Sequence, residues 1–165
     1  MISIQNNTDE NFIAIRAIAK EVWPIAYGAI LSQEQSDYMM EMMYSIPSLQ
    51  NQANDKGHRF ILATENEITV GFAAYEFNYN KKPKTKIHKI YILPNQQGKG
   101  IGKDLIDFIE NKAKERHQKA LILNVNKNNI AIRFYERIGF SISLEEVIDI
   151  GNGYVMDDYV MEKSI

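Results

Sequence analysis

Three of the nine glycines in this 165-residue chain fall within five positions, at Gly98, Gly100 and Gly102. Residues 86–93 before them are rich in β-branched and aromatic side chains and predict a strand that Pro94 stops. The segment after them predicts an amphipathic helix, with an apolar stripe at Ile101, Leu105, Phe108, Ile109 and Ala113. Glycine in such a turn allows positive φ and close approach to a ligand. The fold must therefore contain a strand, a glycine turn and a helix in direct succession.

The remaining periodicities extend this unit to the order β-ααα-βββ-α-β-α-ββ. Strands are predicted at residues 1–5, 59–64, 68–77, 86–93, 120–125, 140–150 and 154–161. Helices are predicted at residues 8–22, 33–44, 47–55, 101–113 and 128–138. We expect Trp23-Pro24 to break the first helix, Asn128 to cap the last, and Gly139 to end it. Helices mixed with a strand-rich centre predict an α/β (α+β) fold, a three-layer sandwich on one mixed sheet.

Length and composition indicate one globular domain, residues 1–165, with 45% hydrophobic and 24% charged residues. Cysteine is absent, which excludes disulfides, cysteine-ligated zinc and thiol nucleophiles. No apolar run approaches the ~18 residues of a membrane span, and no signal-peptide pattern opens the chain. We therefore expect a cytoplasmic protein without membrane contacts.

Charge is unevenly distributed, because residues 81–137 carry fourteen basic and five acidic side chains between acidic ends. A basic middle segment suggests a polyanionic ligand, although solvated faces can also drift in charge. The pI near 5.9 argues against a nucleic-acid-binding protein.

The glycine turn suits a phosphate group, since helix N-terminal amides attract anions and Lys99 and Lys103 add positive charge. The Walker pattern fails, because only three residues separate Gly98 from Gly102 and Asp104 replaces its Ser/Thr. The Rossmann pattern lacks its third glycine. The pattern that fits is Gln97-x-x-Gly100-x-Gly102, with a plain packing turn as the alternative.

A second motif lies further on, as Asn129-x-Ala131-x-x-Phe134-Tyr135-x-x-x-Gly139-Phe140. Asparagine amides gather before and within it, at Asn124, Asn126, Asn128 and Asn129, where they can bond a peptide-like ligand. The alternative is that Phe134 and Tyr135 belong to the core.

These two motifs, in this order, resemble the signatures of the Gcn5-related N-acetyltransferase (GNAT) superfamily. The resemblance spans residues 59–163 and is sharpest over residues 87–140. The ending Met156-Asp157-Asp158-Tyr159 is similar to the bacterial spermidine/spermine acetyltransferase branch. The resemblance implies the GNAT fold, an α/β/α sandwich around a mixed, mostly antiparallel sheet of six to seven strands. It also implies that a primary amine attacks acetyl-CoA directly in a ternary complex.

The resemblance further implies where acetyl-CoA binds. Its pyrophosphate would meet the loop Gln97, Gly98, Lys99, Gly100, Ile101, Gly102 and Lys103. Its pantetheine arm would pair with the backbone of Ile90, Tyr91 and Ile92, and its far end would meet Asn124 and Asn129. No metal ion is implied.

Catalysis needs an acid for the CoA thiolate and a base for the ammonium of the acceptor. Tyr135 matches the acid of the family. The base is left open among His88, Glu76 and a water relay; alternation places His88 on the same strand face as Ile90. The histidine at position 88 is similar to the pattern of the arylalkylamine acetyltransferases, which have a histidine at this point. The spermidine-type branch more often has a glutamate there. A purely structural His88 is the alternative reading.

The acceptor is expected to be a small amine, a polyamine or a protein amine, in falling order. Trp23, Tyr27, Glu76 and Asp149 are candidate contacts for it, although core aromatics and solvated acids would look the same. A non-catalytic acyl-CoA-binding regulatory protein is the rival class, against which the retained Tyr135 argues. We expect a monomer or homodimer.

Overall fold

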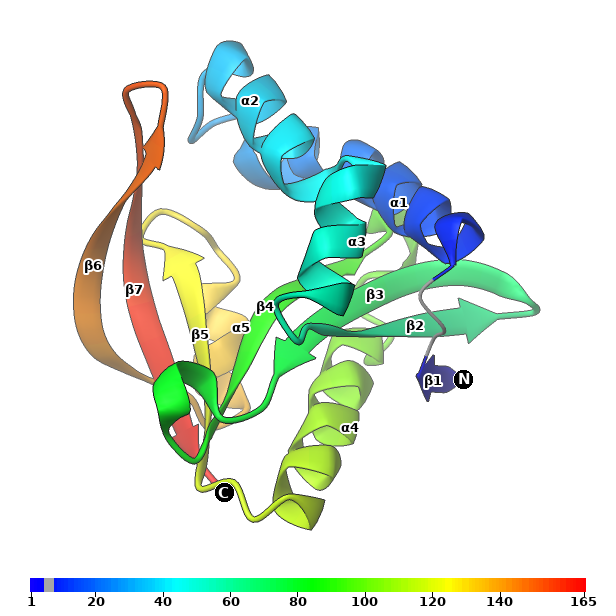
Figure 1. Cartoon of the computed structure of the whole chain (residues 1–165), viewed down its shortest axis with the longest axis vertical. Helices are drawn as coiled ribbons and strands as arrows, with labels where there is room; N and C mark the ends of the chain where they lie inside the picture. The colour runs from blue at the N-terminus through cyan, green and yellow to red at the C-terminus, as the bar shows by residue number, and fades with distance from the viewer. Residues whose placement is uncertain (5–7) are drawn as a thin grey trace.

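Seven strands form a single sheet in the order β1-β2-β3-β4-β5-β7-β6 (Figure 1). The structure is a computed structural model that describes residues 1–4 and 8–165. The strands are β1 (Ile2–Ile4), β2 (Arg59–Glu65), β3 (Ile68–Glu76), β4 (Lys84–Ile92), β5 (Ala120–Asn126), β6 (Ser141–Gly151) and β7 (Tyr154–Ser164). The helices are α1 (Asp9–Tyr27), α2 (Gln33–Tyr44), α3 (Ile46–Asn54), α4 (Ile101–Glu115) and α5 (Ile132–Arg137). The predicted order of elements is confirmed; Gln5, predicted to end the first strand, lies outside the described residues.

Two cores, one on each face of the sheet, confirm the three-layer arrangement. Helices α1 to α3 cover one face (Figure 1). There Phe12 of α1 belongs to the same buried cluster as Phe60 of β2 and Phe72 of β3. Helices α4 and α5 cover the other face, where Leu105, Ile109 and Ala113 of the apolar stripe of α4 are fully buried and Ile101 and Phe108 are partly buried. Burying such side chains is the main favourable contribution to folding.

The sheet is mixed, because β4 and β5 are parallel while all other described neighbours are antiparallel. Strands β4 and β5 pair only from Lys84 opposite Ala120 to Ile87 opposite Leu123. Beyond these four pairs the two strands run on to Ile92 and Asn126 without pairing to each other. The sheet therefore opens beside the glycine turn that follows β4.

The prediction that Trp23-Pro24 ends the first helix is wrong, since α1 continues to Tyr27. Proline removes one helical N–H bond, but Pro24 lies in the last turn and its carbonyl still accepts from the Gly28 amide at 3.0 Å. Trp23 is buried, with its ring centroid 4.7 Å from that of Tyr27. Tertiary packing of the last turn outweighs the lost bond.

The prediction that Asn128 caps the last helix is also wrong, because α5 begins only at Ile132. The Asn126 side chain accepts from the Asn128 amide, and the Asn129 side chain accepts from the Ala131 amide, each at 2.9 Å. Such local side-chain bonds favour turns over helix. The segment after β5 is thus a pair of turns.

His88 occupies an irregularity of β4. Ala74 of β3 pairs with Lys89 and Tyr75 pairs with Ile87, so His88 has no partner residue on β3. An extra residue of this kind interrupts the alternation of side chains. His88 stacks on His58 at the face covered by α1 to α3, whereas Ile90 packs into the α4 core. The prediction that His88 and Ile90 share a face is therefore wrong.

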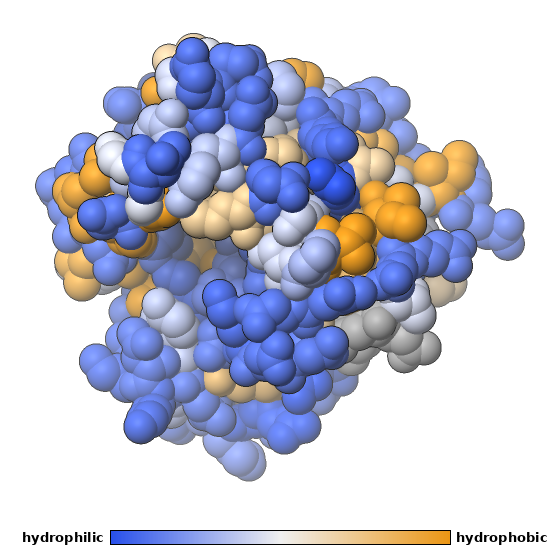
Figure 2. Space-filling model, turned by 45° about the horizontal axis from the view of Figure 1, so that its top comes forward, coloured by the Kyte–Doolittle hydropathy of each residue, from blue (hydrophilic) through white to orange (hydrophobic). Residues whose placement is uncertain are grey.

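The surface is mostly hydrophilic on the face drawn in Figure 2, with apolar side chains in separate groups. Among the described residues, no helix combines the length and apolar character needed to cross a membrane.

Candidate active site

Two cavities meet where β4 and β5 diverge. The first has a volume of about 680 Å³ and extends along β4 to the glycine turn and α5. The second, of about 260 Å³, lies on the side of α1 and α2 and is bounded by β6 and β7. Both are lined by Tyr27, Ile87, His88, Lys89, Tyr91, Asn124 and Val125. The two cavities therefore share a wall at the opening in the sheet.

Most of the predicted site residues line these cavities. The first cavity is lined by His88, Ile90, Tyr91, Ile92, Gln97, Gly98, Gly100, Ile101, Gly102, Lys103, Asn124, Asn129 and Tyr135. Trp23 lines the second cavity and Tyr27 lines both. Lys99, Glu76 and Asp149 line neither. The Asp149 carboxylate instead accepts from the Gly151 amide at 2.8 Å, at the end of β6.

The glycines of the turn have two different tasks. Gly98 and Gly100 have φ of +80° and +87°, and a Cβ on either would meet no atom within 4 Å. Gly102 packs closely, because a Cβ there would lie 3.1 Å from Ile92 Cδ1 and 3.4 Å from Phe134 Cζ. The first two glycines thus shape an open turn, and the third lets α4 approach β4 and α5.

The start of α4 fits an anionic group. The amides of Ile101, Gly102 and Lys103 lie in the first helical turn, where no intrahelical acceptor exists, and these residues line the first cavity. The positive end of the helix dipole adds to this preference. The Gln97 side chain donates to the Ile92 carbonyl at 3.2 Å and so ties the turn to the end of β4.

The exposed edge of β4 fits an extended ligand that contains amides. Ile90, Tyr91 and Ile92 line the first cavity beyond the last pairing with β5. Strand edges of this kind bind peptide-like groups through backbone hydrogen bonds.

Tyr135 stands on α5 and contributes to the wall of the first cavity. Burial raises the pKa of Tyr135 well above its usual value, and the nearby Tyr27 raises it further. The Tyr27 and Tyr91 hydroxyls lie 3.2 Å apart beside it. Tyr135 therefore keeps its phenolic proton at neutral pH.

The second cavity combines aromatic rings with charged groups. Trp23, Tyr44 and Tyr79 supply the rings, and Lys86, Lys89, Glu146 and Asp158 supply the charges. Burial lowers the pKa of each of the two lysines to about 8. Lys86 donates to the Asn124 amide oxygen, and the amide nitrogen of Asn124 donates to Glu146 at 2.9 Å and to Asp158 at 3.4 Å. This network joins one lysine to both carboxylates.

Asp158 is fully buried, and its Oδ1 has no hydrogen-bond partner among the described residues. Burial raises the pKa of Asp158. A buried carboxylate oxygen without a partner is costly, so it marks a place where a cationic donor would be favourable. The sequence analysis names Asp158 only within the ending Met156-Asp157-Asp158-Tyr159, because nothing local distinguishes it from the exposed Asp157.

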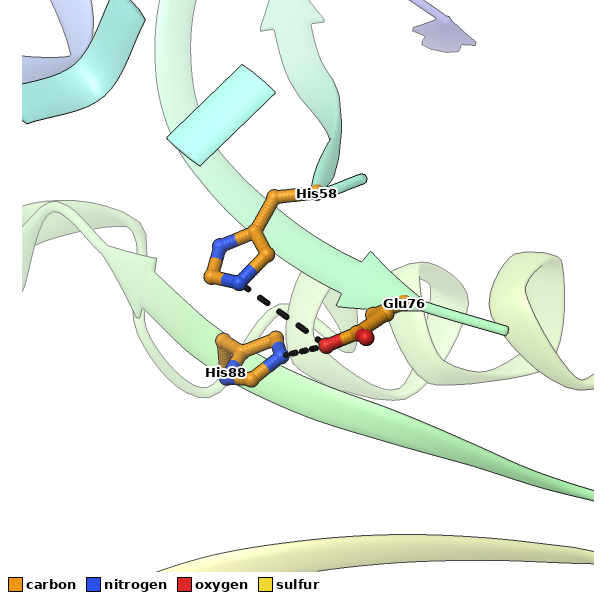
Figure 3. A group of neighbouring side chains, drawn as sticks. All are labelled: His58, Glu76 and His88. Atoms are coloured by element: carbon orange, nitrogen blue, oxygen red, sulfur yellow. Dashed lines mark hydrogen bonds and ion pairs between the residues drawn. The ribbon is translucent and has the colours of Figure 1, made fainter. Parts of the chain in front are cut away.

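His58, Glu76 and His88 form a cluster (Figure 3), of which His88 lines both cavities. The His88 Nε2 lies 2.8 Å from Glu76 Oε2, the His58 Nε2 lies 3.9 Å from the same oxygen, and the two rings stack with centroids 3.8 Å apart. Burial lowers the pKa of His58 to about 4 and that of His88 to about 2, helped by nearby lysines. Both imidazoles are therefore neutral. Sequence reasoning missed His58; its only signal is a place just before the strand beginning at Arg59.

Comparisons with known proteins agree with this geometry. The model of the acetyltransferase (GNAT) family matches residues 12–140. The 5-NmdU N-acetyltransferase of Pseudomonas phage PaMx11 is 32% identical over 133 residues, which are 80% of this chain and 89% of that protein. The spermidine N(1)-acetyltransferase of Thermoplasma acidophilum is 24% identical over 161 residues, which are 94% of this chain and 96% of that protein.

Among solved structures, the PaiA N-acetyltransferase of Thermoplasma acidophilum in complex with coenzyme A matches with a TM-score of 0.80 and 22% identity. The match covers 100% of this chain and 99% of that one, and it confirms the predicted fold. The family match and the phage relative also confirm the predicted class of enzyme. The chain belongs to the GNAT family and is an acyl-CoA-dependent N-acetyltransferase that acts on amines.

Proposed function

We propose that acetyl-CoA binds in the first cavity, that a small primary amine with a second positive charge binds in the second, and that the acetyl group passes directly between them. The observation that carries this proposal is the wall common to the two cavities, which includes His88, Tyr91 and Asn124. Two ligands that meet at one opening can react without a covalent enzyme intermediate. The absence of cysteine agrees with direct transfer.

In this proposal the pyrophosphate of acetyl-CoA contacts the open turn at Gly98 and Gly100 and the first amides of α4. The pantetheine arm pairs with β4 from Ile90 to Ile92. Support comes from the free space above both glycines and from the length of β4 that has no β5 partner. The far end of the arm then reaches the common wall, where the thioester meets the amine.

The acceptor amine arrives as an ammonium ion, since alkyl amines have a pKa near that of lysine, about 10.4. We assign the removal of its proton to His88 rather than Glu76, because His88 lines both cavities and Glu76 lines neither. The Glu76 carboxylate accepts from His88 Nε2, which leaves the lone pair on Nδ1. Nδ1 then accepts the proton directly or through one water molecule, and the Glu76 carboxylate, 2.8 Å from Nε2, stabilises the imidazolium that forms.

Tyr135 is the proposed acid for the departing CoA thiolate. A thiolate of this kind has a pKa near 8.5, so protonation assists its departure. Support comes from the place of Tyr135 in the wall of the first cavity and from its protonated hydroxyl at neutral pH. The backbone amides at the exposed edge of β4 are the proposed donors to the oxyanion.

The unpartnered oxygen of Asp158 supports an acceptor with a second ammonium group. In a di- or polyamine, one nitrogen reacts at the common wall while another bonds Asp158, with Glu146 nearby. Aromatic rings at Trp23, Tyr27 and Tyr44 add cation–π attraction. The similarity to a spermidine acetyltransferase agrees with this choice.

Gly100→Glu is expected to weaken CoA binding about 100-fold or more, because a carboxylate would face the pyrophosphate. Isothermal titration calorimetry with CoA measures the affinity. Gly153→Glu in the β6–β7 turn is the matched control, since Gly153 has φ of +77° and equally open surroundings. Equal CoA affinity in both variants would refute the placement of the pyrophosphate.

Tyr135→Phe is expected to lower kcat by about 10²-fold, the usual scale of general acid catalysis, with CoA affinity nearly unchanged. Initial rates of thiol release, measured beside CoA titrations, separate the two quantities. Tyr159→Phe on β7 is the control. An unaltered kcat in Tyr135→Phe would exclude Tyr135 as the acid.

His88 predicts an unusual pH dependence. Because its pKa is lowered, the imidazole stays unprotonated as the pH falls from 8 to 6, so kcat should show no break near the usual histidine value of about 6.5. His88→Gln should lower kcat about 10²-fold across this range, whereas His117→Gln at the end of α4 should not. Wild-type rates in His88→Gln would rule out the base role, and a break near 6.5 would contradict the buried neutral state.

Asp158→Asn is expected to raise KM for spermidine about tenfold or more, since a charge-assisted hydrogen bond is lost. For a monoamine such as butylamine the KM should change little. Asp157→Asn is the control, because Asp157 is exposed and pairs with Lys127. Equal changes for the two amines would show that Asp158 does not bind the second ammonium.

A further inference from the structure

Three side chains with metal-binding atoms come together from three neighbouring strands. His58 precedes β2, Glu76 ends β3, and His88 is the extra residue of β4 (Figure 3). Their ligand atoms all lie within 4.8 Å of one another. Donor atoms in a tetrahedral zinc site are about 3.3 Å apart, given bonds of 2.0–2.1 Å. The two histidine-to-carboxylate distances, 2.8 and 3.9 Å, lie on either side of that value.

The donor set matches one class of cation. Two imidazole nitrogens and one carboxylate oxygen, with a fourth position open, are typical ligands of Zn²⁺, whereas Mg²⁺ and Ca²⁺ prefer oxygen alone. The side chains of His58, Glu76 and His88 are 9%, 26% and 19% exposed, so a hydrated ion can reach them. Both imidazoles are already neutral, which is the form that coordinates a metal.

We propose that His58, Glu76 and His88 bind one divalent cation of the Zn²⁺ type, and that this binding inhibits acetyl transfer. The stacked rings, now 15° from parallel, turn about their Cβ–Cγ bonds so that both Nε2 lone pairs converge on the ion. The ion replaces the hydrogen bond between His88 and Glu76. The sequence implied no metal, because residues 58, 76 and 88 follow no metal-binding spacing.

Neighbouring charges set the expected affinity. The ammonium groups of Lys56, Lys86 and Lys89 act on His88 and repel a dication. Glu76 contributes the one negative charge among the three ligands. We therefore expect micromolar rather than nanomolar binding, strongest for the cations late in the Irving–Williams order.

Inhibition follows from the two nitrogens of His88. Without the ion, Nε2 carries the ring proton and donates it to Glu76, and Nδ1 keeps its lone pair. When the ion takes Nε2, the ring proton moves through solvent to Nδ1, with no net change in protonation. Nδ1 can then no longer accept the proton of the amine. This consequence rests on the proposed function, whereas cation binding does not.

The test is calorimetric titration of the full chain with ZnCl₂, beside thiol-release assays at the same Zn²⁺ concentrations. We expect one ion per chain, about tenfold or more weaker binding in His58→Ala, and unchanged binding in His117→Ala, which removes the remaining histidine of the chain. Zn²⁺ should inhibit wild type and His117→Ala. His58→Ala, compared with its own rate without metal, should resist inhibition.

Thermal melts show whether each variant is folded, and His58→Gln replaces His58→Ala if the latter is unstable. Equal Zn²⁺ affinity in wild type and both His58 variants, or loss of binding in His117→Ala, would overturn the site. Absence of binding at millimolar Zn²⁺ would do the same. Binding at His58 without inhibition would overturn the inhibitory part alone and would contradict His88 as the base, leaving the two cavities and their ligands unaffected.

Discussion

The structure depends on the short pairing of β4 with β5. Four residue pairs hold these parallel strands together before they diverge. The sheet does not come apart, because β3 pairs with β4 as far as Ile92 and β7 pairs with β5 as far as Asn126. Among the described residues, the part of β4 beyond Ile87 therefore has no β5 partner, and the sheet is still continuous. An extended ligand can pair with that part of β4, and a second ligand can approach the same opening from the other face.

Backbone features define the first cavity, and side chains from distant segments form the second. This difference decides how well the residues of each cavity could be predicted from the sequence. The first relies on backbone: positive φ at Gly98 and Gly100, amides of α4, and the edge of β4. Such features correspond to short, regular sequence motifs, so the residues of the glycine turn could be predicted by number. The second cavity joins side chains from α1, β4, β6 and β7. No local pattern reports that Trp23 and Asp158 share a wall, or that the Asp149 carboxylate accepts from the Gly151 amide.

The same distinction explains the errors in the fold. Periodicity predicted the order of all strands and helices, because each element carries its own apolar face. Three predictions are wrong for related reasons. Packing keeps the helix going through Pro24, local turns replace the helix start at Asn128, and strand register moves His88 to the other face. The extra residue at His88 is a property of how β3 and β4 pair. The sequence of β4 gives no sign of this extra residue, because the alternation of side chains is the only pattern that it offers.

The register of β4 also determines the chemistry of His88. With regular alternation, its imidazole would share the α4 side with Ile90, among apolar side chains. The extra residue turns it to the opposite face, against Glu76 and the His58 ring. There the Nε2 nitrogen of His88 is hydrogen-bonded to the Glu76 carboxylate, which leaves the lone pair on Nδ1. The displacement of one residue thus places Nε2 of His88 at the proposed cation site and leaves Nδ1 for the proposed proton transfer.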